Sequence, residues 1–260
     1  MNKHTFRYLI AQEPVPGARI TLSRADTHHL TRVVRRHIGD ELEVIDLAGA
    51  IWPATVIEDG TDAVVELAAA PRVRARLAPV TLYQGLCEWG RLDMVVEKCA
   101  ELGVARVVIF AGSRSRRVPD QGAWRRRRER FVRVAESAAR QSGQGRLPQI
   151  DGVLRIEEVL EAIVAGPSVL LDPTGEVALA RGLEEAARWD QLALVVGPDS
   201  GFADAEVAAA RASGVQVCHL GDTTLRAETA AIVGVSVALA ATGHLERQSK
   251  AVSTYGDPGV

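Results

Sequence analysis

The sequence predicts an α/β protein in which a small β-barrel precedes a mostly parallel sheet covered by helices. Short strand-like runs broken by glycines fill the chain up to about residue 67, and a proline- and arginine-rich stretch follows at 71–79. Beyond it, apolar runs alternate with amphipathic stretches, the pattern of parallel strands joined by helices. The 260 residues therefore divide into a first domain at 1–75, a second at 76–246 and a polar tail at 247–260.

The first domain contains four predicted strands and one predicted helix. The strands are residues 19–22, 41–46, 52–57 and 63–67, with glycines in the loops between them. Leu30, Val33 and Val34 recur at helical spacing behind Asp26 and Thr27, two residue types that cap helices. We therefore expect a short helix over 26–36 that interrupts the strands, and a linker over 71–79.

The second domain alternates strands and helices along its length. The predicted strands are residues 80–86, 104–110, 168–171, 192–196 and 215–219. The predicted helices are residues 91–102, 124–141, 156–165, 179–187, 203–213 and 228–243. Strands joined through helices lie parallel, so we expect one sheet with helices packed on it.

Composition excludes several classes of protein. With 47% apolar residues and a net charge of −2, the chain is neither disordered nor collagen-like. Its longest apolar run, at 230–241, is too short to cross a bilayer, and the first ten residues lack the apolar segment of a secretory signal. Cys87, Cys99 and Cys218 fit no zinc or CxxC spacing, so we expect buried, reduced thiols and no metal site. We expect a cytoplasmic protein without membrane association.

The charge is unevenly distributed along the chain. Between positions 114 and 146, eleven arginines and three acidic residues give a net charge of +8, while the rest of the chain sums to −10. Such polarity favours an anionic partner, with nucleic acid as the first candidate. The four arginines at 125–128 would point about 100° apart around a helix, so they cannot all face a core. A solvated helix face without a partner is the alternative.

Two glycine-containing loops, at 197–201 and 220–224, directly follow predicted strands. In open α/β sheets, ligands bind beyond the carboxyl ends of the strands, where glycine lets the backbone approach them. Neither loop has the GxGxxG or GxxxxGK[ST] pattern, and Ser200 lies in Gly-x-x-Ser-Gly rather than in the Gly-x-Ser-x-Gly of serine hydrolases. Each loop taken alone is equally well explained as a simple turn into the next helix.

The two loops carry a family resemblance. The sequences Gly-Pro-Asp-Ser-Gly-Phe at 197–202, Leu-Gly at 220–221 and Leu-Arg-Ala-Glu-Thr-Ala at 225–230 resemble the C-terminal signature of the 16S ribosomal RNA (uracil(1498)-N3)-methyltransferase family, in the SPOUT superfamily. Weaker matches, such as His-His-Leu at 28–30 and Glu-Leu-Gly-Val at 101–104, extend the similarity over about 240 residues. The chain departs from the family at Asp199 and Ser200, where Glu-Gly is usual, and at Thr223 and Thr224, where Arg-Ile is common. These departures bear on cofactor affinity and on any contact of position 223 with RNA or a partner subunit.

The resemblance implies a fold, a cofactor and an assembly. The first domain would be a PUA-like barrel, and the second a SPOUT domain whose C-terminal segment forms a trefoil knot. S-adenosyl-L-methionine would bind among the loops that follow the strands ending near 171, 196 and 219. The implied cofactor-binding residues are Leu171, Gly197, Gly201, Leu220, Gly221 and Leu225. The resemblance also implies a homodimer that packs through the knot, with the apolar helix at 228–243 in its interface.

The implied reaction sets requirements for catalysis. Methylation of uracil N3 needs a nitrogen that has lost its proton, held opposite the sulfonium methyl group. A carboxylate would assist proton removal and a cation would stabilise negative charge on the ring oxygens, which makes Glu228 and Arg226 the candidate catalytic residues. Alternatively, Glu228 complements its helix dipole, and Arg226 bonds to loop carbonyls or pairs with Asp222. No metal is expected, because the sulfonium already activates the methyl group.

The implied substrate is 16S ribosomal RNA, within the 30S subunit. The candidate RNA-binding residues, drawn from both domains, are Arg7, Arg35, Arg36, Arg114, Arg116, Arg117, Arg125 and Arg126. Trp52 and Trp89 either stack on bases or pack in the core, and packing is the commoner role. Two alternatives stay open: the same chemistry on another RNA or base, and a non-catalytic RNA-binding relative that has lost the cofactor.

Overall fold

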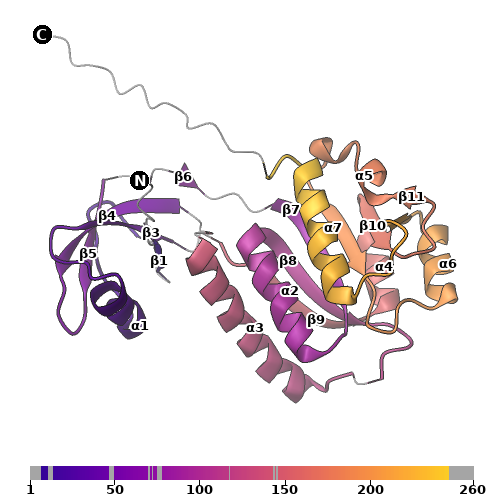
Figure 1. Cartoon of the computed structure of the whole chain (residues 1–260), viewed down its shortest axis with the longest axis horizontal. Coiled ribbons are helices and arrows are strands. Elements are labelled where there is room, and N and C mark those ends of the chain that lie inside the picture. The colour runs from indigo at the N-terminus through magenta and orange to yellow at the C-terminus, as the bar shows by residue number, and fades with distance from the viewer. Residues whose placement is uncertain are drawn as a thin grey trace, which may run out of the picture.

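The computed structural model describes residues 7–10, 14–46, 50–69, 71, 73–74, 78–116, 118–142, 144 and 146–245. Within these ranges the chain forms two sheets, a smaller one near the N-terminus and a larger one that carries most of the helices (Figure 1). Arg117 and the predicted tail at 247–260 lie outside the described residues, as does the side chain of Arg7.

The first domain is a six-stranded mixed sheet. Its strands β1 (Arg7–Leu9), β3 (Glu41–Ile45), β4 (Ala50–Glu58), β5 (Val64–Leu67) and β2 (Arg19–Thr21) follow one another in that order, and β6 (Val73–Arg74) pairs with β4. Alternating side chains such as Val44, Val56 and Val65 are fully buried and form its core. The four predicted strands are confirmed. The sequence pattern missed β1 and β6, which at three and two residues are too short to show periodicity.

The helical segment of this domain corrects the prediction of one helix over 26–36. An α-helix, α1 (Arg24–His28), is followed by a π-helical segment, η1 (His29–Val33). Ser23 is the N-cap: its Oγ accepts the amide proton of Asp26 at 3.2 Å and donates to Asp26 Oδ2 at 2.6 Å. Asp26 and Thr27 are therefore buried inside the first turns rather than capping them. The helix ends before Arg35, which has a left-handed φ of 55°.

The second domain is a seven-stranded sheet in which every pairing is parallel, as predicted. Its strands, in spatial order, are β11 (Val177–Ala178), β13 (Gln216–His219), β10 (Ser168–Leu171), β12 (Leu192–Val196), β7 (Ala78–Gly85), β8 (Val104–Ala111) and β9 (Gln149–Arg155). The sequence pattern missed β9, an edge strand in which Asp151 and Gly152 interrupt the apolar run.

Helices cover both faces of this sheet (Figure 1). The helices α2 (Trp89–Leu102), α3 (Gln121–Ser142) and α7 (Ala227–Ala241) pack on one face, while α4 (Ile156–Ile163) and α6 (Asp204–Ala212) pack on the other. Alternation along β7 supplies both cores, because Val80 and Leu82 belong to the first and Tyr83 to the second.

Two further predictions need correction. The helix predicted over 179–187 is divided into α5 (Leu179–Gly182) and a 3₁₀ turn at Ala186–Arg188. Gly182 lies so close to β13 that a Cβ on it would stand 2.7 Å from the Sγ of Cys218, so this segment follows tertiary packing rather than helix periodicity. The linker predicted over 71–79 contains β6 and the first residues of β7.

The strand order determines where a ligand can bind. From β7 the chain continues outward through β8 and β9, and then crosses to β10 on the far side of β12. Such a reversal of strand order opens a crevice at the carboxyl ends of the strands, which is where ligands bind in sheets of this kind. The loops after β10, β12 and β13 all lie at this edge.

A pocket at the carboxyl ends of three strands

A cavity of about 570 Å³ lies between the loops that follow β10, β12 and β13 and the start of α7. Its size falls within the range of roughly 300–1,000 Å³ that small-molecule sites occupy. All six predicted cofactor residues lie in its lining, namely Leu171, Gly197, Gly201, Leu220, Gly221 and Leu225. Arg226 also lines the cavity. Gly201 and Gly221 have φ angles of 67° and 105°, backbone conformations that favour glycine.

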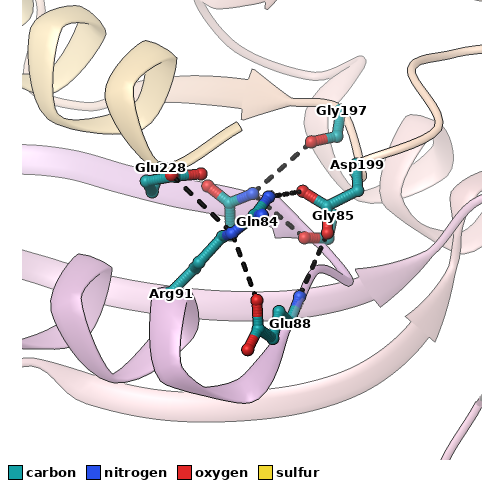
Figure 2. A network of polar contacts seen from close by, with 7 residues as sticks. All are labelled: Gln84, Gly85, Glu88, Arg91, Gly197, Asp199 and Glu228. Atoms are coloured by element: carbon teal, nitrogen blue, oxygen red, sulfur yellow. Dashed lines mark hydrogen bonds and ion pairs between the residues drawn. The ribbon is translucent and has the colours of Figure 1, made fainter. Parts of the chain in front are cut away.

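The loop after β12 is fixed to α2 through Asp199 (Figure 2). Asp199 Oδ2 accepts the backbone N–H of Glu88 at 3.2 Å, and Oδ1 accepts a proton from Arg91 Nη1 at 2.9 Å. We call these two contacts the Asp199 clamp. Both of its side chains line the pocket, so the clamp joins one pocket wall to the first turn of α2. An aspartate at position 199, where the family usually has glutamate, makes both contacts from one side chain.

The same loop approaches the end of β7 very closely. Gln84 is fully buried, and its Nε2 donates to the carbonyl oxygens of Gly85 at 3.0 Å and Gly197 at 3.4 Å. A Cβ at Gly85 would stand 2.2 Å from the backbone nitrogen of Pro198 and 2.5 Å from the carbonyl carbon of Gly197. Only a residue without a side chain permits this backbone approach.

The two candidate catalytic residues have different surroundings. Arg226 is exposed and lines the cavity, and its side chain makes no hydrogen bond or ion pair within the described part of the chain, so the predicted alternative of bonds to loop carbonyls or a pair with Asp222 is absent there. Glu228 is buried and does not line the cavity; its Oε1 lies 3.8 Å from Arg91 Nε (Figure 2). Its Oε2 is buried and has no hydrogen-bond partner among the described residues. Glu228 therefore contacts the pocket wall through Arg91.

Cys87 lies beside this network, and its surroundings disfavour the thiolate. Burial, and after it the charges of Asp199 and Glu228, raises the pKa of its thiol to about 12, while Arg91 opposes the shift. Cys99 and Cys218 are buried as predicted, whereas Cys87 is only half-buried, which corrects the prediction for that residue; burial raises the pKa of the Cys99 and Cys218 thiols. All three sulfurs stay protonated at neutral pH.

A buried carboxylate supports the far side of the same loop. Glu206 Oε1 accepts the N–H of Ser113 at 2.7 Å, and its Oε2 accepts the N–H of Ala203 at 2.6 Å. Beside it, Arg114 donates from Nη1 to the carbonyl oxygen of Phe202 at 3.0 Å. Arg114, predicted to bind RNA, thus braces the loop that lines the pocket.

The other predicted RNA-binding residues lie away from the pocket lining. Arg35 and Arg116 are exposed, Arg125 and Arg126 are exposed on α3, and Arg36 lies 3.9 Å from Asp40. Of the arginines at 125–128, only some are available to bind a partner.

Two members of that run have internal roles. Arg127 stacks over the ring of Trp89 at 4.5 Å, and Arg128 donates to the carbonyl of Ile150. Trp52 is buried and donates to Asp46, so both tryptophans pack rather than present a free ring.

Sequence reasoning missed the residues that hold the pocket in shape, namely Gln84, Gly85 and Arg91. Their sequence signal is weak, because each acts on a loop more than a hundred positions away along the chain. The described ranges contain no group of three or more His, Cys, Asp or Glu side chains placed to hold a metal ion. They also contain no helix long and apolar enough to span a membrane.

Replacing Asp199 with asparagine should loosen the clamp. Asparagine removes the charge that holds Arg91 and turns one acceptor into a donor facing the Glu88 amide. We expect amide exchange of Glu88 and of residues 197–202 to become about tenfold faster by mass spectrometry. The change should be smaller when Arg91→Met is already present, because the two residues share one contact. Asp204→Asn, at an exposed position five residues on, is the matched control; equal exchange in both variants would contradict the clamp.

Comparison with known proteins agrees with this architecture. A family model described as an RNA methyltransferase domain matches residues 74–239, and one described as an RNA methyltransferase PUA domain matches residues 22–67. "Ribosomal RNA small subunit methyltransferase E" of Synechocystis sp. is 30% identical over 89% of this chain and 76% of its own length. The protein of the same name from Mycobacterium bovis is 32% identical over 89% of this chain and 88% of its own.

A solved structure supports the fold over both domains. The Neisseria gonorrhoeae ribosomal RNA small subunit methyltransferase E, bound to S-adenosyl methionine, matches with a TM-score of 0.77 at 22% identity, covering 91% of this chain and 98% of that one. The predicted PUA-like first domain is confirmed, while the trefoil knot stays a prediction. Since the methyltransferase model spans more than half of the chain, the chain belongs to the RNA methyltransferase family, with a PUA domain ahead of its methyltransferase domain.

Proposed function

We propose that the chain transfers a methyl group from S-adenosyl-L-methionine to N3 of one uridine in the 16S ribosomal RNA of the small subunit. The observation that carries the proposal is the pocket, in which three loops with the family's cofactor signature converge on one cavity. The names of the relatives, which describe small-subunit ribosomal RNA methyltransferases, support the substrate. The match to a PUA domain of RNA methyltransferases supports RNA binding by the first domain.

The chemistry of the pocket suits this cofactor. Leu171, Leu220 and Leu225 offer apolar walls for an adenine ring, and the glycine-containing loops present backbone groups to its polar parts. The carboxylate of Asp172, which forms no ion pair among the described residues, also lines the cavity, and negative charge favours a sulfonium. When bound, the cofactor supplies an electrophilic methyl group.

The chain's own residues must bind the uracil and manage the charge that develops on it. Once N3 loses its proton to solvent water, negative charge spreads onto O2 and O4 of the ring. We assign Arg226 to these oxygens, because it lines the cavity and has no competing partner among the described residues. We assign Glu228 a positioning role, because it contacts Arg91, which lines the cavity, and does not line it itself.

A basic stripe on the first domain supports RNA as the substrate. Arg24, His28 and Arg32 are exposed at intervals of four residues along α1 and η1, and Arg35 follows them. None of the three arginines forms an ion pair within the described residues. Steps of four residues place these groups about 6 Å apart along the helix, a spacing at which several can reach one phosphate backbone. Arg116, Arg125 and Arg126 would extend the surface onto the second domain.

The salt dependence of RNA binding tests this stripe. Replacing Arg24 and Arg32 with glutamine should weaken RNA binding and reduce the slope of log K against log salt by about 1 per residue. Arg19→Gln is the matched control, because Arg19 is exposed on the same domain but is paired with Glu66 at 3.2 Å. Equal slopes for the double variant and the wild-type protein, measured by fluorescence anisotropy, would remove the stripe from the RNA surface.

The proposal includes an assembly and a cellular location. Helix α7 is apolar on its inner face, at Ala231 and Val235, and also outside, where Val233 is 38% exposed. A helix that is apolar all round is normally buried, which supports a homodimer packed through this helix and the proposed knot. We propose the assembled 30S subunit in the cytoplasm as the substrate, because only there does the target nucleotide have its final surroundings.

Methyl transfer is the direct test. The protein is incubated with tritiated S-adenosylmethionine and either 30S subunits or free 16S RNA that lack the modification, and the labelled nucleoside is mapped by digestion and mass spectrometry. We expect 3-methyluridine at one site, with 30S preferred. Label on another RNA or another base atom would replace the stated substrate. Absence of cofactor binding by calorimetry would favour a non-catalytic RNA-binding protein.

A further inference from the structure

An ion pair joins the two domains. Arg140, near the end of α3 in the methyltransferase domain, donates from Nη1 to Asp26 Oδ1 at 3.2 Å, and Asp26 belongs to α1 of the PUA domain. The side chain of Asp26 is 9% exposed and that of Arg140 is 37% exposed. Helix α3 also contacts β1, so the pair lies within the contact between the domains (Figure 1).

The carboxylate of this pair is rigidly held on its own side. Asp26 Oδ2 accepts the hydroxyl proton of Ser23, whose Oγ also accepts the Asp26 amide proton, so the N-cap fixes the side chain. Arg140 is less completely bound, because its Nε is buried without a hydrogen-bond acceptor among the described residues. The contact thus joins the preorganised Asp26 carboxylate of the first domain to the Arg140 side chain of the second.

The pair connects the two helical segments that carry the basic surfaces, although Arg125 and Arg126 lie at the opposite end of α3 from Arg140. The helix that carries Asp26 bears the stripe residues Arg24 and Arg32, and the helix that carries Arg140 bears the exposed Arg125 and Arg126. Domains within one chain move relative to each other unless their interface restrains them. A partly buried ion pair contributes little net stability, but separating it leaves the buried Asp26 carboxylate without its counter-ion. The pair therefore acts mainly on the relative position of the two domains.

We propose that Asp26 and Arg140 are positioning residues that set the angle between the PUA domain and the methyltransferase domain, so that RNA held by the first presents its target nucleotide to the pocket of the second. The part that concerns RNA rests on the proposed function. The part that concerns the angle between the domains does not depend on that function, and small-angle X-ray scattering tests it separately.

The test compares Arg140→Met with Arg130→Met. Arg130 lies on the same helix and pairs with Asp93 at 2.9 Å, but that pair is internal to the methyltransferase domain. Small-angle X-ray scattering should show a broader distribution of interatomic distances for Arg140→Met and an unchanged one for Arg130→Met. In methylation assays, KM for the 30S substrate should rise about tenfold in Arg140→Met, with the Kd for S-adenosylmethionine unchanged within twofold.

Conservative variants separate positioning from stability. Arg140→Lys keeps the charge and should recover most of the KM, while Asp26→Asn keeps a partner for Ser23 and should reproduce the defect of Arg140→Met. Asp26→Asn carries the test if Arg140→Met does not fold. Unchanged scattering and unchanged KM in the folded variants would overturn the proposal. If the wild-type protein transfers no methyl group, the proposed function fails, and scattering alone still decides the role of the pair.

Discussion

Replacing Gly85 with alanine is expected to lower the affinity for S-adenosylmethionine, because a wall of the cavity must move, and to lower the rate of methyl transfer by about 100-fold, since a misplacement of roughly 1 Å costs that much in rate. A Cβ at this position would stand 2.2 Å from Pro198 N and 2.5 Å from the carbonyl carbon of Gly197. Both atoms belong to the backbone of the loop that lines the cavity, so no side chain can rotate away. The loop must move, and the contacts of Gln84 and Asp199 that depend on its position weaken with it.

The same substitution should also reduce stability. Overpacking a buried contact costs about 1–3 kcal/mol, which thermal or urea unfolding would detect. Gly90→Ala is the matched control. Gly90 lies five residues away within α2, and a Cβ there meets nothing within 4 Å. An alanine inside a helix is favoured over glycine by roughly 0.5–1 kcal/mol, so Gly90→Ala should raise stability and leave affinity unchanged. Wild-type affinity in a folded Gly85→Ala protein would contradict the close approach.

The alternation of strands and helices in the second domain was predictable because each element buries a regular apolar face. Strand β12 consists of apolar residues alone and β10 of three apolar residues after Ser168, and α2 repeats its buried residues at helical spacing from Leu92 to Ala100. Where tertiary contacts decide the structure, the pattern fails. Strand β9 takes its place at the sheet edge despite Asp151 and Gly152, and α5 ends where Gly182 meets Cys218.

In the candidate site, too, some features could be predicted from the local sequence and others depend on long-range contacts. The loops that line the cavity were recognisable from glycines that follow strands and from the family signature, since both are local features of the sequence. The contacts that hold those loops were not. Arg91 reaches Asp199 across 108 positions, and Gln84 reaches Gly197 across 113. Neither arginine nor glutamine at these places has any periodicity that would mark it, so only the folded chain shows their role.

Replacing Arg226 with methionine is expected to lower kcat by about 100- to 1,000-fold, the usual effect of removing one group that stabilises developing charge. Arg226 precedes α7, lines the cavity and is exposed, so its loss leaves no buried partner unpaired and should not unfold the protein. Cofactor affinity, measured by calorimetry, should change by less than about threefold, because the charge that Arg226 is assigned to stabilise lies on the uracil and not on the cofactor. Arg226→Lys should recover part of the activity, since it keeps the charge but not the forked geometry.

Glu228→Gln separates the two candidate residues. Since Glu228 contacts Arg91 at 3.8 Å and does not line the cavity, its amide variant should affect catalysis only through the position of Arg91. We therefore expect a loss in kcat of no more than about tenfold, with the shape of the pH–rate profile unchanged. If Glu228→Gln instead loses as much as Arg226→Met and abolishes the rise of kcat with pH, the carboxylate is itself the proton acceptor. Arg91 would then have to move aside for the uracil to reach Glu228, because Arg91 lies between that carboxylate and the cavity.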